Sequence, residues 1–143
     1  VPAAMLGDVG KLIEYSSTCA PPFVQAAGRV ALSRGEDAIA RTVQRLRQGR
    51  DHLAQCLGRV PGVELAAPAR GAMYTFFRVE GVKDSLGFCK RLVTEAGLGL
   101  APGVAFGPEG EGYLRWCYAS STSRLDEGVG RLAAYLDHHP NTR

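Results

Sequence analysis

Residues 113–119 read YLRWCYA, a run in which bulky side chains surround a single arginine. Successive side chains of a β-strand point to opposite faces of a sheet. One face of such a strand carries Tyr113, Arg115 and Cys117, and the other carries Leu114, Trp116 and Tyr118. The run therefore predicts a strand from which a guanidinium projects between large apolar neighbours.

Further strands and a helix are predicted upstream of this run. Short strands are expected at 63–65, 72–79 and 98–101, and the nearly continuous apolar stretch 72–79 (AMYTFFRV) is typical of a central strand covered on both faces. A helix is expected between Asp84, which can cap its start, and Gly97, which suits the left-handed conformation that ends many helices.

A last helix is predicted to begin at residues 123–126, with its apolar face formed by Leu125, Val129, Leu132 and Leu136. The resulting order is strand, strand, helix, strand, strand, helix. This order predicts an α+β, two-layer domain in which the helices pack on one face of a small mixed sheet.

A long helix is expected before these strands. Ser33 and Glu36 have the S-x-x-E spacing of a capping box, and Gly58 follows the last apolar position. The apolar stripe of this helix comprises Ile39, Val43, Leu46, Leu53 and Leu57. A helix of this length in so small a chain is typical of a connector between two bodies.

Upstream of the long helix, residues 8–34 predict a helix, a polar loop and a second helix. We therefore divide the chain into residues 1–34, a connecting helix at 35–58 and a C-terminal domain at 59–143.

Composition argues against several classes of protein. The 143 residues are 45% hydrophobic and 22% charged, which is typical of a soluble globular chain. A net charge of +3 without a basic run argues against nucleic-acid binding, and no apolar stretch is long enough to cross a membrane. We therefore expect a cytoplasmic protein with no nucleic-acid or membrane partner. The first residue is not Met, which suggests that the chain belongs to something larger.

Cysteine and histidine spacing gives no sign of a metal site. The residues concerned are Cys19, Cys56, Cys89, Cys117, His52, His138 and His139. The cysteines form no C-x-x-C pair and are expected to be free thiols, and the histidines are expected on the surface. We therefore predict no metal site and no catalytic histidine.

Arg115 is the first candidate for a binding residue. A guanidinium in apolar surroundings is costly unless it is paired, and its planar fork matches a carboxylate. The partner can be an internal Asp or Glu, solvent at a sheet edge, or the carboxylate of a substrate. The strand pattern alone leaves these alternatives open.

The loop at residues 101–112 (APGVAFGPEGEG) contains four Gly and two Pro. No Gly-Lys-Ser/Thr sequence follows it, so a phosphate cradle is not predicted. The loop is either a surface turn or a shaped loop whose backbone lies over a ligand.

Three motifs in this order resemble one protein family. They are residues 71–76 (GAMYTF), 101–107 (APGVAFG) and 110–115 (GEGYLR), with Ala119 four residues after the arginine. These motifs are similar to the C-terminal half of the class I/II pyridoxal-phosphate-dependent aminotransferases, the aspartate aminotransferase-like group of fold type I. Residues 12–25 and the long helix resemble the end of that family's large domain and its interdomain helix, so the resemblance covers essentially the whole chain.

The resemblance implies an activity for the complete protein and roles for residues of this chain. The family transfers an amino group from an amino acid to a 2-oxo acid with pyridoxal 5'-phosphate, usually as homodimers, in amino acid metabolism. Arg115 is then expected to bind the α-carboxylate of the substrate. Pro102, Gly103 and Phe106 are expected to belong to an active-site loop.

The resemblance also implies that this chain is a fragment. In the family, the lysine that forms the Schiff base with the cofactor lies upstream in the large domain, and Lys11, Lys83 and Lys90 are not placed like it. We expect the chain to consist of a large-domain tail at 1–34, the interdomain helix and the small domain. We expect it to contain no catalytic residue, and by itself neither to bind the cofactor nor to catalyse the reaction. Two alternatives remain: a stand-alone carboxylate-binding or interaction module, and part of a fold type I lyase. The substrate's side chain is not identified.

Overall fold

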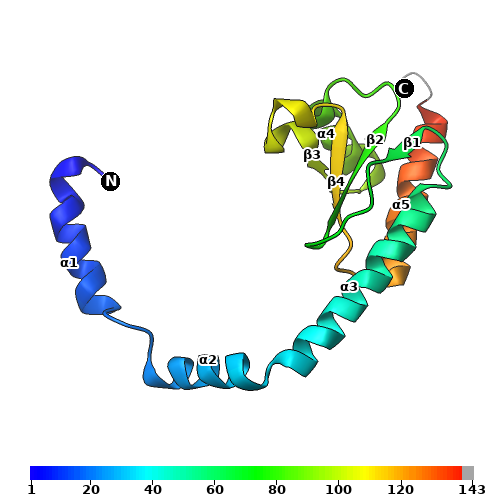
Figure 1. Ribbon diagram of the computed structural model, residues 1–143. Coiled ribbons are helices and arrows are strands. Elements are labelled where there is room, and N and C mark those ends of the chain that lie inside the picture. Colours follow the sequence, from blue (N-terminus) through cyan, green and yellow to red (C-terminus); the bar gives the residue numbers. More distant parts are fainter. Residues whose placement is uncertain (140–143) are drawn as a thin grey trace. The chain divides into compact units, whose positions relative to one another are not determined.

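Four short strands form a single sheet, and helices cover one of its faces (Figure 1). The computed structural model describes residues 1–139. The helices are α1 (Leu6–Ser16), α2 (Pro22–Arg34), α3 (Glu36–Leu57), α4 (Ser85–Ala96) and α5 (Thr122–His138). The strands are β1 (Val63–Leu65), β2 (Tyr74–Val79), β3 (Ala101–Pro102) and β4 (Tyr113–Cys117), and short 3-10 turns lie at η1 (Ala3–Met5), η2 (Gly103–Phe106) and η3 (Pro108–Gly110). The predicted α+β fold and order of elements are confirmed.

The sheet has the order β1-β2-β4-β3, and every neighbouring pair among the described strands is antiparallel. The prediction of a mixed sheet is therefore wrong. β2 and β3, joined through α4, run in the same direction, but β4 lies between them. Because the two parallel strands never become neighbours, no parallel hydrogen-bonded pair forms.

Helix ends follow the predicted chemistry in α4 and depart from it elsewhere. Asp84 accepts a hydrogen bond from the amide of Gly87 at 2.8 Å, and Gly97 adopts the left-handed conformation, with φ 61°. The predicted capping box at Ser33 is wrong, because α2 continues through Ser33 and its hydroxyl donates to the carbonyl of Val30. α3 begins one residue after Gly35 instead.

The start of α5 is also displaced from the predicted position. Ser121 caps this helix by accepting from the amide of Arg124 at 3.4 Å, so the helix begins at Thr122, one residue before the predicted start.

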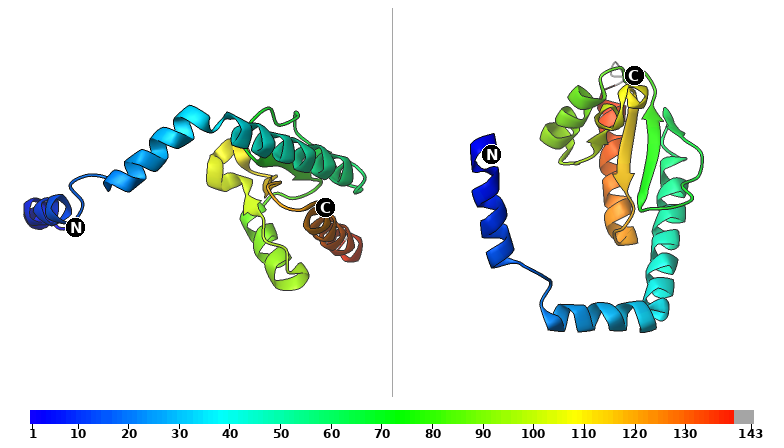
Figure 2. Two further views of the ribbon diagram at one scale, coloured as in Figure 1. Left: turned by 90° about the horizontal axis from the view of Figure 1, so that it is seen from below. Right: turned by 60° about the vertical axis from the view of Figure 1, so that its left-hand side comes forward.

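The core lies between the sheet and three helices. Its completely buried members are Leu53 and Leu57 of α3, Phe77 of β2, Phe88 and Leu92 of α4, Leu114 of β4 and Leu132 of α5. α5 contacts both α4 and α3, and Figure 2 shows it between them beside the strands. Burial alternates along β4 and along the second half of β2, so the other face of the sheet is only partly covered. The prediction that the apolar stretch is covered on both faces is therefore wrong in this chain.

The chain divides into two units, Val1–Arg41 and the part from Thr42 onward, and the division falls within α3. The first unit contains α1, α2 and the start of α3, and none of its residues is buried. The second unit contains the sheet and the core. Gly49 allows close packing there, because a Cβ on this residue would lie 2.5 Å from the carbonyl oxygen of Tyr118.

Candidate functional site

Arg115 lies in the middle of the partly covered face of the sheet. Its neighbours across the ladder are Phe76 of β2 and Ala101 of β3. The adjacent residues of β4, Leu114 and Trp116, point to the opposite face and are buried in the core. The strand alternation deduced from the sequence is thus confirmed, and it directs the guanidinium away from the core.

Two aromatic rings hold the guanidinium of Arg115. Its central carbon lies 3.8 Å from the ring centroid of Phe106 and 4.2 Å from that of Tyr74. Contacts of this kind are attractive because a cation lies over the electron-rich face of each ring, and they use none of the N–H donors that a guanidinium can offer to a ligand. Among residues 1–139, none of the ion pairs involves Arg115. The internal Asp or Glu considered as its partner is thus not found within the described part of the chain.

More aromatic rings surround this pair. Phe76 meets Phe106 edge to face, with ring centroids 5.6 Å apart, and its centroid lies 6.3 Å from that of Tyr113. A second cation, Arg78, lies over Tyr113 at 5.0 Å. The face therefore presents Arg115 within an aromatic surface, an arrangement suited to a ligand that carries both a carboxylate and apolar groups.

The glycine-rich loop places Phe106 over Arg115. Gly103 is buried against the backbone of Gly110, and a Cβ on either glycine would collide with the other. Phe106 ends η2, and its ring is about half exposed. Of the three predicted loop residues, the structure brings Phe106 to Arg115, whereas Pro102 pairs in the ladder with Leu114 and Gly103 lies at the base of the loop.

A polar cluster under the loop fixes its path. The carboxylate of Glu111 accepts from the amides of Ser85, at 2.7 Å, and Gly112, at 2.8 Å. The buried hydroxyl of Ser85 accepts from the amide of Val104 at 3.4 Å. These backbone hydrogen bonds hold the pKa of Glu111 below its ordinary value, because they favour the charged carboxylate. No sequence motif indicates this role for Glu111 or Ser85.

Several aminotransferases are similar to this chain. A putative aminotransferase of Bacillus subtilis is 31% identical, over 88% of this chain and 32% of its own length. An LL-diaminopimelate aminotransferase of Oleidesulfovibrio alaskensis is 32% identical, over 92% of this chain and 34% of its own length. The crystal structure of an aromatic aminotransferase from Pyrococcus horikoshii matches with a TM-score of 0.79 and 30% identity, covering 91% of this chain and 35% of that one. No protein-family profile matches the chain.

The chain belongs to the fold type I, aspartate aminotransferase-like family. It spans about a third of the length of the curated relatives it matches. Its α+β part corresponds to the C-terminal domain of the solved aminotransferases. The resemblance stated for the three motifs is thereby confirmed.

Among the described residues, none of the helices has both the length and the apolar character needed to span a membrane.

Within this aminotransferase domain, the first motif is tied to the end of β4. The amide of Tyr118 donates to the carbonyl of Met73 at 2.9 Å, and its hydroxyl donates to the carbonyl of Ala72 at 3.0 Å. Ala72 has a φ of 58°, a conformation that is uncommon for a residue other than glycine. These bonds fix the turn that leads into Tyr74, one of the two rings on Arg115.

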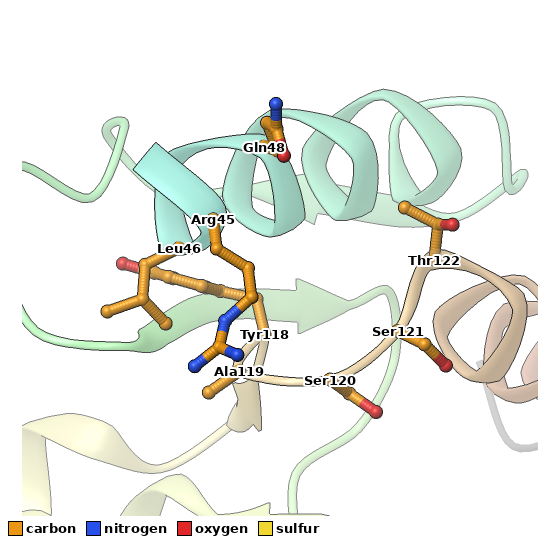
Figure 3. A pocket seen from close by; sticks show the side chains of 8 residues that line it. All are labelled: Arg45, Leu46, Gln48, Tyr118, Ala119, Ser120, Ser121 and Thr122. Atoms are coloured by element: carbon orange, nitrogen blue, oxygen red, sulfur yellow. The ribbon is translucent and has the colours of Figure 1, made fainter. Parts of the chain in front are cut away.

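A pocket borders this end of β4 (Figure 3). It is lined by Arg45, Leu46 and Gln48 of α3 and by residues 118–122. Arg45 points from α3 toward Ala119. The pocket does not include Arg115, so it is a separate feature of the aminotransferase domain.

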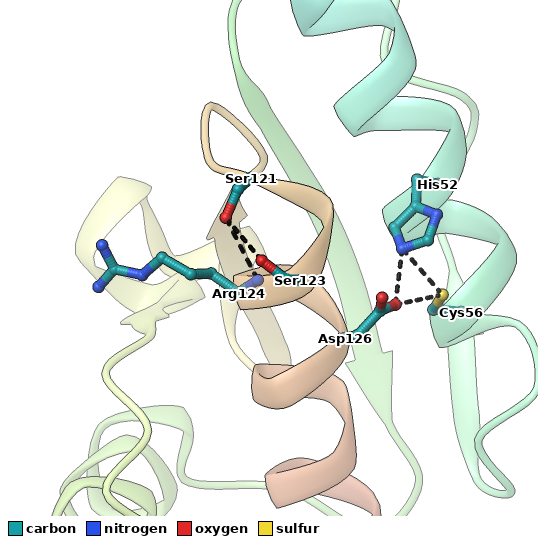
Figure 4. Close-up of polar contacts among 6 residues, drawn as sticks. All are labelled: His52, Cys56, Ser121, Ser123, Arg124 and Asp126. Carbon is teal, nitrogen blue, oxygen red and sulfur yellow. Dashed lines mark hydrogen bonds and ion pairs between the residues drawn. The ribbon is translucent and has the colours of Figure 1, made fainter.

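A second polar cluster joins α3 to α5 (Figure 4). The Nε2 atom of His52 lies 2.6 Å from Oδ1 of Asp126, and the sulfur of Cys56 lies 3.5 Å from the same oxygen. Partial burial and the carboxylate of Asp126 raise the pKa of the Cys56 thiol. Residue spacing does not predict this cluster, because 70 or more positions separate Asp126 from the other two residues.

Proposed function

We propose that this chain is the part of an aminotransferase that binds the substrate carboxylate, and that the complete enzyme transfers an amino group from an amino acid to a 2-oxo acid. In this proposal Arg115 binds the α-carboxylate. The observation that carries it is the guanidinium of Arg115, which lies over the rings of both Phe106 and Tyr74 on the partly covered face of the sheet. The aminotransferase relatives support the activity proposed for the complete enzyme.

The geometry supports a positioning role for Arg115. A guanidinium offers two parallel N–H donors to a carboxylate, which fixes the ligand's orientation as well as its place. The rings of Phe106 and Tyr74 limit rotation of the guanidinium and lower the local dielectric, which strengthens the charge interaction. Holding the carboxylate in this way orients the bond from the α-carbon to its hydrogen, and orientation of this kind lowers the barrier to reaction.

We assign pyridoxal 5'-phosphate to the remainder of the enzyme. A similar solved structure, 26% identical with a TM-score of 0.73, is a PLP-dependent aminotransferase from Streptococcus suis. When bound, this cofactor supplies the electron sink for amino acid chemistry. Lys11, Lys83 and Lys90 are all exposed, so none of them fits a desolvated Schiff-base position. We therefore propose that the chain alone neither holds the cofactor nor catalyses transamination.

The apolar side chains of the first unit support the proposal that it is the tail of a large domain. Leu12, Ile13, Phe23 and Leu32 are all at least 60% exposed. Exposed groups of this number and size are typical of a surface that another part of a protein covers. We propose the boundaries 1–34, 35–58 and 59–143 for the large-domain tail, the interdomain helix and the small domain, within a homodimeric enzyme.

The test is Arg115→Ala in the complete enzyme, with Arg78→Ala as the matched control. Both arginines lie on the same sheet face and stack on aromatic rings, but only Arg115 is proposed to bind substrate. We expect kcat/KM to fall by about 30- to 5,000-fold in Arg115→Ala, which corresponds to about 2–5 kcal/mol for a lost charge partner. The Arg78→Ala enzyme should stay within a few-fold of the parent.

Two further measurements separate this role from general damage and from other reactions. An amine substrate that lacks the α-carboxylate should react equally well with the parent and with Arg115→Ala, because it has nothing for Arg115 to bind. Unchanged kcat/KM toward amino acids would exclude the proposed role. Product analysis distinguishes a transaminase, which forms a new amino acid for each 2-oxo acid released, from a lyase, which does not.

A further inference from the structure

Three side chains with metal-binding atoms meet on the helical side of the domain, away from Arg115. His52 and Cys56 lie one turn apart on α3, and Asp126 lies on α5 (Figure 4). The imidazole Nε2, the thiol sulfur and a carboxylate oxygen all lie within 4.8 Å of one another. The side chains of His52 and Asp126 are 29% and 55% exposed, so ions in solution can reach the cluster.

The separations are close to those of a tetrahedral metal site. Zinc bonds of about 2.3 Å to sulfur and about 2.0–2.2 Å to nitrogen or oxygen place neighbouring ligand atoms about 3.4–3.6 Å apart. The sulfur of Cys56 lies 3.7 Å from Nε2 of His52 and 3.5 Å from Oδ1 of Asp126. Only the 2.6 Å contact between His52 and Asp126 must lengthen, by less than about 1 Å.

The cluster is held by rigid elements. His52 and Cys56 each precede a completely buried leucine of α3, Leu53 and Leu57. Asp126 follows Leu125 of α5, which is also buried. Buried neighbours on both helices fix the backbone positions from which the three side chains extend, as a preorganised metal site requires. The Asp126 side chain, the most exposed of the three, can make the small movement described above.

We propose that His52, Cys56 and Asp126 bind a divalent transition-metal ion, with Zn²⁺ as the preferred ion. A thiolate, an imidazole and a carboxylate form a ligand set suited to zinc, whereas Mg²⁺ and Ca²⁺ take oxygen ligands. Three protein ligands leave a fourth position for water or another small ligand. On binding, the thiol of Cys56 releases its proton to solvent, and the metal links α3 to α5.

The first experiment measures zinc binding by the complete protein. The protein is stripped with a chelator, and Zn²⁺ is then added in competition with a chromophoric chelator. We expect one zinc per chain, and at least a tenfold loss of affinity in Cys56→Ser and in His52→Ala. The matched controls Cys19→Ser and His138→Ala change an exposed cysteine and an exposed histidine outside the cluster and should bind zinc as the parent does.

A second experiment identifies the ligand directly. Co²⁺ bound to a thiolate gives a charge-transfer absorption, which is read as the difference between the parent and Cys56→Ser so that cofactor absorption cancels. The band should be present in the parent and in Cys19→Ser. Equal zinc affinity in the parent and in Cys56→Ser, or no cobalt–thiolate band in the parent, would overturn the proposal. If Cys56→Ser does not fold, the cobalt–thiolate band is compared between the parent and Asp126→Asn at the same Co²⁺ concentration. The band should be weaker in Asp126→Asn, which lacks one of the three proposed ligands, and an equal band would contradict the proposal.

Discussion

Both units of this chain contain helices with apolar side chains along one face, but only the second unit buries such side chains. No residue of Val1–Arg41 is buried, whereas the unit from Thr42 onward has a core with seven completely buried side chains, at 0% exposure, among its apolar residues. α3 passes through both: Ile39 is 55% exposed, while Leu53 and Leu57 lie on the same predicted stripe and are fully buried. An amphipathic pattern therefore shows that a helix has a face to bury, and it does not show whether the partner belongs to the same chain.

The largest difference in the free energy of unfolding is expected between substitutions at two positions of α3. Leu53→Ala removes a core side chain and should lower the free energy of unfolding of this chain by about 2–5 kcal/mol. Ile39→Ala should change it by no more than about 0.5 kcal/mol, because Ile39 is mainly exposed. Urea unfolding followed by the fluorescence of Trp116, the single tryptophan, measures both. Similar losses in the two variants would contradict the comparison.

The same pair tests the proposed large domain. In the complete enzyme, the large domain is proposed to cover the first unit, so Ile39→Ala should cost more there than in this chain alone. An equally small effect in both proteins would argue against a covered face at Ile39.

A difference in stability of intermediate size is expected between alanine substitutions at two glycines. Gly49→Ala places a Cβ against the carbonyl oxygen of Tyr118 and should destabilise the second unit by about 1–3 kcal/mol. Gly28 of α2 has no atom within 4 Å of a Cβ built on it, so Gly28→Ala should favour the helix by about 0.5–1 kcal/mol. Trp116 fluorescence reports the first change, and far-ultraviolet circular dichroism reports the second. A stabilised Gly49→Ala would show that α3 does not pack as described.

The smallest effect concerns acid stability within the second unit. The pKa of Glu111 is lower in the folded state, so its ionised form stabilises the fold above its unfolded pKa of about 4.3. This contribution is lost as the pH falls through the folded pKa. Glu111→Gln should therefore lower the unfolding midpoint at neutral pH and flatten its decline below about pH 4.3. Glu109→Gln, at an exposed position of the same loop, is the control and should keep the parent's acid profile.

Local features were predictable from the sequence because they depend on neighbours along the chain. Alternation along residues 113–119 correctly placed Arg115 on the face opposite Leu114, and the cap at Asp84 and the left-handed Gly97 follow from the chemistry of those residues. The capping box at Ser33 failed because the helical preference of α2 extends through that residue. The motif resemblance identified the family, which the strand pattern alone does not.

Features that depend on distant contacts were not predictable in this way. The antiparallel sheet results from β4 lying between β2 and β3, which local periodicity does not encode. The same sheet order brings Phe106 and Tyr74 to Arg115. It also brings the amide of Ser85 to the carboxylate of Glu111. The meeting of His52 with Asp126 likewise requires α3 and α5 to pack side by side.

The contact between Gly103 and Gly110 has a consequence for protein engineering. These glycines meet backbone to backbone at the base of the loop, so the base closes without help from the side chains at its tip. Pro108 and Glu109 at the tip are exposed. A spectroscopic label or a redesigned sequence at Glu109 can therefore be introduced while Phe106 keeps its place over Arg115.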